Sequence, residues 1–164
     1  MATLHFICGK AAAGKTTLAR LLATRHAAIV LCEDEWLVRL GAEIVDLADF
    51  VRHAKPLRAA LAPHAVALLR LGTSVVLDFA GNTPKERAWV RSIFEAAAAD
   101  HVLHYIAASD EMCRRRLRQR NETKPDGIYY GDVTEAMFEA VTRHFVPPSD
   151  EEGFRVMRHD AEAG

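Results

Sequence analysis

The sequence predicts an α/β fold in which a parallel sheet is covered by helices on both faces. Five short apolar segments alternate with segments of helical periodicity, as is typical of parallel sheets. A glycine-rich turn follows the first apolar segment, and acidic residues follow the second and stand at the end of the third. The chain of 164 residues is long enough for one domain that buries about 70% of its unfolded surface. Residues 1–164 are therefore expected to form a single domain.

The strands are expected at the apolar segments, and two other segments are expected to interrupt regular structure. Pro63 lies inside the long helical segment Leu57–Leu71, so a kink or a break is expected there. Asn121–Gly131 contains one proline and two glycines and has no helical period, which predicts a mobile loop. The five expected strands are Leu4–Cys8, Ala27–Cys32, Ser74–Phe79, His101–Ala107 and Phe154–Met157.

Capping residues mark the starts of three expected helices. Thr83–Glu86 has the form of a capping box with proline at the first helical position, and it opens a helix that ends near Ala99. Asp132–Glu135 has the same form and opens a helix toward His144. Ser109 is a suitable N-cap for the arginine-rich helix that follows it.

The glycine-rich turn GKAAAGKT is expected to hold phosphate. Gly9 and Gly14 allow backbone conformations that a Cβ would block, and the alanines keep large side chains away. Backbone N–H groups can then point into one concavity at the positive end of the next helix. The spacing matches the P-loop pattern GxxxxGK[ST], in which Lys15 reaches the β- and γ-phosphates and the Thr16 hydroxyl binds Mg²⁺. The expected nucleotide-binding residues of this stretch are Gly9, Lys10, Ala11, Ala12, Ala13, Gly14, Lys15, Thr16 and Thr17.

Acidic residues are expected at the same edge of the sheet, because ligands gather outside the carboxyl ends of parallel strands. Asp34 follows the second strand and is the expected general base, with Glu33 and Glu35 as alternatives. Alternatively, these three acids have no catalytic role, and their negative charges only stabilise the positive N-terminal end of a helix. Asp78 ends the apolar stretch Val75–Leu77, as the acid of a Walker B element does, and is expected to hold Mg²⁺ through water.

Five arginines occupy seven positions between Arg114 and Arg120, directly before the expected loop. Arg116 and Arg120 are four residues apart and share one helical face. An arginine that a closing lid brings onto the transferring phosphate is a common device of small kinases. We therefore expect a lid at about residues 114–131, with Arg116 and Arg120 binding nucleotide and Arg120 acting in catalysis. Arg114, Arg115 and Arg118 are expected mainly in solvent.

The composition limits the classes of partner and the compartment. Lys and Arg number 21 against 22 Asp and Glu, so no overall basic field indicates nucleic acid or an acidic membrane. The chain shows neither a secretion signal nor an apolar stretch long enough to span a membrane, which predicts a cytoplasmic protein. Cys8, Cys32 and Cys113 form no CxxC pair and are interpreted as core residues. The histidines show no metal-ligand spacing on a helix, and His101 and His104 should point to opposite faces of a strand.

Taken in chain order, GKAAAGKT, CEDEWL, VVLDF, LHYIA, RRLRQRN and FVPPSDEE resemble the small P-loop kinases of an AAA-type ATP-binding protein family. Relatives of that family are the zeta toxins, chloramphenicol phosphotransferases and polynucleotide 5′-hydroxyl kinases. The resemblance covers about Thr3–Arg158. It implies an adenylate-kinase-like three-layer sandwich with strand order 2-3-1-4-5, ATP in the P-loop, and Val146–Pro148 near the adenine. The residues to which it assigns functional roles are Lys15, Thr16, Asp34 and Arg120.

The resemblance does not name the phosphate acceptor. Polynucleotide kinases of this group tend to place an arginine three residues after the acid, and here that position is Leu37. A nucleic-acid acceptor is therefore disfavoured, unless Arg39 replaces that arginine. Trp36 beside the acid suits a small organic acceptor, although core packing explains a tryptophan equally well. The expected function is the Mg²⁺-dependent transfer of the γ-phosphate of ATP to a hydroxyl of a small molecule, with polynucleotide 5′-hydroxyl kinase as the alternative.

Two other classes of function compete with a kinase. Asp78–Gly81 has the DxxG form of a GTP-binding switch, but no NKxD follows a later strand, because Asn121–Lys124 has the wrong order. A nucleotide-binding regulatory module without catalysis is the second competitor. The site is not decayed in sequence, because it keeps all four of Lys15, Thr16, Asp34 and Asp78.

Overall fold

The computed structural model describes residues 1–161 and contains a five-stranded parallel sheet. The strands are β1 (Thr3–Cys8), β2 (Ile29–Cys32), β3 (Val75–Asp78), β4 (Asp100–Ala107) and β5 (Val156–Asp160). They lie in the order β2-β3-β1-β4-β5, and all four neighbouring pairs are parallel. The expected P-loop strand order is confirmed, and residues 162–164 of the expected domain lie outside the described residues.

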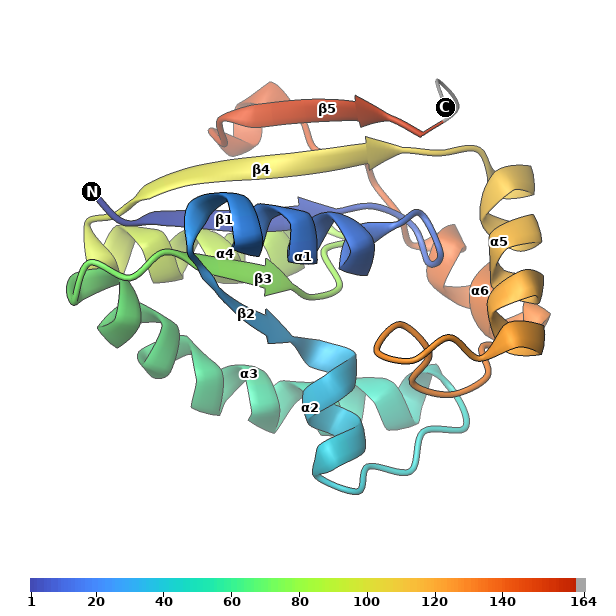
Figure 1. Ribbon diagram of the computed structural model, residues 1–164. Coiled ribbons are helices and arrows are strands. Elements are labelled where there is room, and N and C mark those ends of the chain that lie inside the picture. The colour runs from blue at the N-terminus through green and yellow to red at the C-terminus, as the bar shows by residue number, and fades with distance from the viewer. Residues whose placement is uncertain (162–164) are drawn as a thin grey trace.

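Helices cover both faces of this sheet. They are α1 (Lys15–His26), α2 (Glu33–Arg39), α3 (Leu47–Arg70), α4 (Pro84–Ala97), α5 (Asp110–Thr123) and α6 (Glu135–Arg143), with a short 3₁₀ turn η1 (Asp150–Glu152) before β5. Figure 1 shows α2, the start of α3 and the loop between α5 and α6 gathered beyond the carboxyl ends of the strands. Within residues 1–161, no helix is long and apolar enough to cross a membrane.

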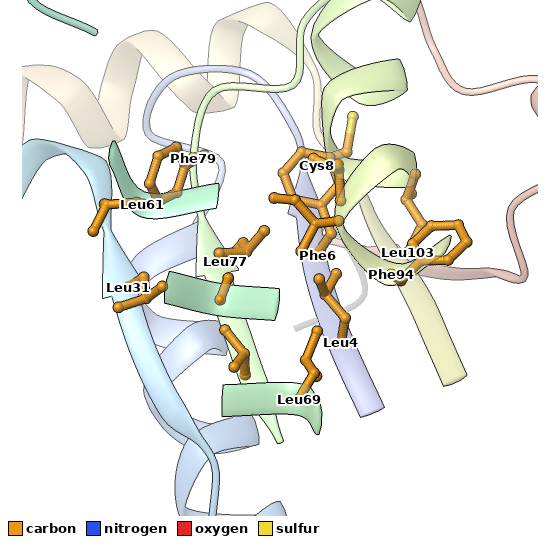
Figure 2. Close-up of a cluster of buried hydrophobic side chains, with 14 of the residues drawn as sticks. Leu4, Phe6, Cys8, Leu31, Leu61, Leu69, Leu77, Phe79, Phe94 and Leu103 are labelled. Carbon is orange, nitrogen blue, oxygen red and sulfur yellow. The ribbon is translucent and has the colours of Figure 1, made fainter. Parts of the chain in front are cut away.

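Alternation along the strands divides the apolar core into two clusters. Leu4, Phe6 and Cys8 of β1 point to the face covered by α3 and α4, whereas Ile7 packs on the opposite side. On that opposite side the buried side chains of α1, α5 and α6 pack against β1, β3 and β4. Figure 2 shows the first cluster, in which Leu61 and Leu69 of α3 face the strands. Successive side chains of a strand point to opposite faces of the sheet, so a continuous apolar strand is buried on both faces when helices cover both.

Two of the three predicted helix starts are confirmed, and one is wrong. The Thr83 capping box opens α4, and the Ser109 hydroxyl accepts the N–H of Met112 at the start of α5. The helix predicted to open at Asp132 is instead capped by Thr134, whose hydroxyl accepts the Met137 N–H at 3.1 Å. The Asp132 carboxylate is engaged elsewhere, because it accepts the hydroxyl of Tyr129 at 2.8 Å.

Of the two outcomes expected at Pro63, a kink or a break, the break does not occur, because α3 runs without interruption from Leu47 to Arg70. Pro63 lies on the exposed side of this helix. The buried stripe of α3 continues on both sides of the proline at intervals of four residues, and its packing against the sheet holds the helix together. The members of that stripe are Leu57, Leu61, Ala65 and Leu69.

Two predicted boundaries are displaced by a few residues. The last strand was expected at Phe154–Met157 but extends over Val156–Asp160. Phe154 instead packs edge-on against Phe94 of α4, with ring centroids 5.8 Å apart. Helix α5 continues to Thr123, so the predicted loop loses its first three residues to the helix.

Candidate active site

The P-loop connects β1 to α1 and has the backbone geometry that its glycines suggest. Gly14 is the N-cap of α1 and adopts φ of +107°, a left-handed conformation that disfavours a Cβ. A Cβ at Gly9 would come within 3.2 Å of the Ile106 carbonyl oxygen, which leaves little room for a larger residue. No side chain caps α1, so its first N–H groups face the cavity in front of the loop.

Lys15 folds back over this loop. Its ammonium donates to the carbonyl oxygens of Gly9 at 3.0 Å and of Lys10 at 2.9 Å. The side chain of Lys10 turns away, to an ion pair with Asp110. Of these two lysines only Lys15 lines the cavity, where an anionic ligand would offer its ammonium a stronger partner than neutral carbonyls do.

Thr16 and Asp78 are brought together from α1 and the end of β3. The Thr16 hydroxyl donates to the Asp78 carboxylate at 2.7 Å, and both residues line the cavity. Asp78 is 7% exposed. A hydroxyl and a carboxylate are the oxygen ligands that Mg²⁺ accepts in proteins, so this pair fits the expected metal-holding role.

Asp34 lies in the first turn of α2 and lines the same cavity. Its side chain is open to the water of the cavity although protein atoms surround it. This enclosure raises the pKa of the Asp34 carboxyl, and the negative charge of Asp78 raises the pKa further. The positive charges of Lys15 and Arg120 act in the opposite direction. Four predicted site residues from four different elements therefore influence one another electrostatically.

The two neighbouring acids have other partners. Glu33 is 2% exposed, and its carboxylate accepts two hydrogen bonds from Arg58 of α3, at 2.6 and 3.0 Å, and one from the Ala80 N–H at 3.0 Å. Glu35 pairs with Arg39 on the surface of α2. The Arg58 contact was not predicted, and nothing in the sequence around Arg58 marks it, because it depends on how α3 crosses α2.

The arginine-rich helix α5 places its members in different environments. Arg116 donates to the carbonyl of Ala13 in the P-loop at 3.0 Å. Arg120 lines the cavity, and its buried Nε has no hydrogen-bond partner within residues 1–161. Burial lowers the pKa of Arg120. The negative charge of Asp34 on α2 acts in the opposite direction. Arg115 and Arg118 are exposed as expected.

Arg114 lies at the surface, as expected, but it also has partners that the sequence did not indicate. Its guanidinium pairs with Glu135 and approaches Glu139 at 3.7 Å, and it lies 5.2 Å from the centroid of the Phe138 ring. Arg114 therefore joins α5 to α6 at the surface. The partners come from a helix about 20 residues further along the chain, which local sequence does not reveal.

The cavity itself has a volume of about 930 Å³. Its floor is the P-loop, and its walls are α2, the start of α3, the end of β3, and α5 with the loop that follows it. Trp36 and Arg39 are not among the residues that line it, so neither has the acceptor-binding position that was considered. Leu37 is buried in the core.

The segment Val146–Pro148, expected near the adenine, lies outside the cavity lining. The Val146 N–H donates to the Asn82 carbonyl at 2.7 Å, and the Val146 carbonyl accepts from Arg87 at 2.8 Å. Arg87 is fully buried and also forms a two-point ion pair with Glu152. The segment is therefore tied to the start of α4, a contact that the sequence did not indicate.

The strand histidines His101 and His104 pack against other rings, and the three cysteines are buried. His101 stacks on Phe94 at 3.9 Å, whereas His104 hydrogen-bonds to His5 and to His159, so the predicted opposite orientation is confirmed. Across residues 1–161 no group of histidine, cysteine and acidic residues is arranged to hold a metal ion. The three cysteines are buried, and burial raises the pKa of Cys8 to about 11. Such a thiol is unreactive at neutral pH.

A family model described as an AAA domain matches residues 4–148. The chain belongs to this family. Solved structures of this fold include a candidate kinase from Chloroflexus aurantiacus, with a TM-score of 0.74, 21% identity, and coverage of 97% of this chain and 88% of that one. A gluconokinase from Sinorhizobium meliloti has a TM-score of 0.65 and 13% identity, covering 99% of this chain and 84% of its own.

An APS kinase from Mycobacterium tuberculosis, in complex with AMPPNP and APS, has a TM-score of 0.59 and 21% identity, covering 81% of this chain and 83% of its own. At this level of identity these likenesses establish the P-loop kinase-like fold. No curated protein matched the sequence.

Proposed function

We propose that this protein is an ATP-dependent phosphotransferase that moves the γ-phosphate of ATP to a hydroxyl of a small-molecule acceptor. The observation that carries the proposal is Asp34, a carboxylate that lines the same cavity as the P-loop lysine and Arg120. The kinase names of the structural neighbours, one of them holding AMPPNP, agree with this reaction class. A GTP switch would not need an acid at this position.

The proposal assigns the nucleotide to the P-loop. The backbone N–H groups of Gly9–Thr16 would surround the β-phosphate, and Lys15 would exchange its two carbonyl partners for phosphate oxygens. Thr16 and Asp78 would hold Mg²⁺, which neutralises charge on the phosphates when it is bound. Arg116 would stay on the loop carbonyl of Ala13 and close the phosphate site from the side of α5.

The transfer step follows from the positions of Asp34 and Arg120. The acceptor oxygen forms a bond to the γ-phosphorus while the bond between that phosphorus and the leaving oxygen of ADP breaks. Asp34 takes the proton of the acceptor hydroxyl, and a raised pKa makes its carboxylate a stronger base than an ordinary aspartate. The planar guanidinium of Arg120, which has a free buried donor, stabilises the charge that spreads over the transferring phosphoryl group.

Asp34→Asn tests the proposal, once a mass-spectrometric screen has found metabolites that gain one phosphate. The amide keeps the shape of the side chain but accepts no proton, so phosphoryl transfer should fall by about 10²-fold or more while the affinity for ATP is retained. Glu35→Gln is the matched control, because Glu35 lies in the same helical turn but pairs with Arg39 on the surface. Full activity in Asp34→Asn, with loss in Glu33→Gln or Glu35→Gln, would assign the base to another acid of this turn.

A thermal measurement separates lost chemistry from a lost fold. Because the folded state raises the pKa of Asp34, the ionised carboxylate is less favourable in the folded protein than in the unfolded chain. Asp34→Asn should therefore raise Tm above the raised pKa, and the gain should shrink as the pH falls toward the ordinary aspartate value of 3.8. A variant that loses both activity and Tm would not support a role as base. ATP binding without acceptor-dependent ADP release in the wild-type protein would indicate a non-catalytic nucleotide-binding module.

A further inference from the structure

The two halves of the cavity differ in charge. The half built from the P-loop and α5 contains Lys15, Arg116 and Arg120, which suits the phosphates of a nucleotide. The other half is built from α2, the segment before and at the start of α3, the end of β3 and the start of α4. In Figure 1, α2 and the start of α3 are drawn below the loop that joins α5 to α6. An acceptor that reaches Asp34 has to occupy this second half.

The wall of this acceptor half is apolar. Ile44, Leu47, Phe50 and Val51 line it from the segment 44–51, and Ile128 lines it from the loop after α5. Ile44 and Phe50 also pack against the buried core cluster, which holds the segment 44–51 in place. Val51 remains 56% exposed. A row of apolar side chains facing a water-filled cavity is stabilised when a ligand with an apolar body covers it.

The ionisable groups of the acceptor half are acidic. Within residues 1–161, the charged side chains of these elements that line the cavity are Glu33, Asp34, Asp78 and Glu86. Arg58 is bound by both carboxylate oxygens of Glu33, lies 3.8 Å from Glu86, and does not line the cavity. The cations that act on Asp34 are Lys15 and Arg120 of the phosphate half. An anionic acceptor in this half would meet the carboxylates of Asp34, Asp78 and Glu86, whereas the cavity-lining cations Lys15 and Arg120 lie in the half assigned to the phosphates of the nucleotide. A neutral acceptor would meet Asn82, whose amide can both donate and accept a hydrogen bond.

We infer that the acceptor is an uncharged hydroxyl compound with an apolar body, and that the segment 44–51 selects it. The inference rests on the proposed phosphotransferase function and narrows it. Phosphorylated, sulfated or carboxylated acceptors and polynucleotides are disfavoured by Asp34 and Glu86, because bringing like charges together in an enclosed site costs binding energy. The hydroxyl lies toward Asp34, and the apolar body lies against Leu47, Phe50 and Val51.

A set of three alcohols tests this inference by binding, without requiring turnover. The probes are 3-phenylpropan-1-ol, its 4-carboxyphenyl analogue, and glycerol, and their affinities are measured by calorimetry on the full chain in the presence of AMPPNP. The neutral aromatic alcohol should bind at least about tenfold more tightly than the carboxylated analogue, which adds an anionic group to the ring, and than glycerol, which lacks the apolar body. Equal or tighter binding of either of the other two would overturn the inference. That result would leave the transfer reaction itself untouched.

A charge introduced into the wall gives the second measurement. Val51→Lys places an ammonium on an exposed, cavity-lining position of α3 and should improve the relative affinity of the carboxylated probe by about tenfold. Val51→Glu should lower the affinity of the carboxylated probe relative to that of the neutral aromatic alcohol. Leu71→Lys is the matched control, because Leu71 is 81% exposed at the far end of α3 and does not line the cavity. An unchanged ratio in both Val51 variants would overturn the assignment of the segment.

Failure of the proposed function has a different signature. In that case the neutral alcohol would still bind preferentially and the Val51 variants would still shift the ratio, but no hydroxyl compound would stimulate ADP release. Rejection of the substrate class, by contrast, would appear as preferential binding of an anionic acceptor together with Asp34-dependent transfer to it.

Discussion

At the scale of single residues, Lys15 carries the clearest expectation. Lys15→Ala should abolish phosphoryl transfer and weaken ATP binding, because the ammonium is the P-loop cation placed to reach the β- and γ-phosphates. The fold should remain, since the hydrogen bonds of this ammonium within residues 1–161 go to two loop carbonyls. ADP release, nucleotide titration and Tm measure the three effects. Turnover at the wild-type rate in this variant would remove the P-loop assignment.

The proposed role of Arg120 depends on the planar shape of its guanidinium as well as on its charge. Arg120→Lys should lose much of kcat, because a compact ammonium cannot reproduce the planar fork that a phosphoryl group accepts. Arg118→Lys is the control on the same helix, since Arg118 is exposed. Steady-state kinetics and thermal unfolding are measured together. A lower Tm with unchanged kinetics would show that Arg120 is a structural residue.

At the scale of elements, a row of histidines joins β1, β4 and β5 and makes the sheet sensitive to acid. His104 hydrogen-bonds to His5 at 3.1 Å and to His159 at 3.0 Å, and burial lowers the pKa of both His5 and His104 to about 4. In the unfolded chain these histidines titrate near 6.5. The unfolded state therefore binds more protons than the folded state as the pH falls from about 6.5 to about 4.

The free energy of unfolding should consequently be highest above pH 6.5 and should fall through this interval. Urea unfolding at a series of pH values between 7.5 and 4 measures the decline. His104→Leu should flatten part of it, even though it lowers stability at neutral pH by removing two hydrogen bonds. His64→Leu is the control, because His64 is exposed on α3. If His104→Leu leaves the slope unchanged, the histidine row is not the source of the acid sensitivity.

At the scale of the whole molecule, the buried Arg87 connects the segment that leads into the edge strand β5 to α4. It pairs with Glu152 at 2.6 and 2.8 Å and donates to the carbonyls of Gly81 and Val146. Arg87→Leu leaves the Glu152 carboxylate without its partner and should cost about 3–5 kcal/mol in the free energy of unfolding. The exposed pair of Arg158 and Asp160 supplies the control, since Arg158→Gln should leave the denaturant midpoint nearly unchanged. A loss no larger than in that control would contradict the role given to Arg87.

Local patterns in the sequence determined much of this protein. The apolar runs placed all five strands to within a few residues, because burial on both faces requires continuous apolar stretches. The P-loop, the Thr83 and Ser109 caps and the acids after β2 were also predicted, since each depends on residues close in the chain. Placing the acids and the P-loop at one edge followed from a general property of parallel sheets.

Only the tertiary structure decided which polar groups meet across elements. It assigned Glu33 to Arg58, Arg114 to Glu135 and Arg87 to Glu152, and it left Asp34 and Arg120 facing the cavity. These pairings depend on how whole helices pack. Helix packing is driven by the burial of apolar area, and the apolar pattern of a helix does not indicate which distant polar residue will become a partner. The same packing keeps α3 helical at Pro63, and it places the segment 44–51 in the wall of the acceptor half of the cavity. The sequence therefore determined the phosphate-binding chemistry, whereas the long-range packing decided what surrounds the acceptor.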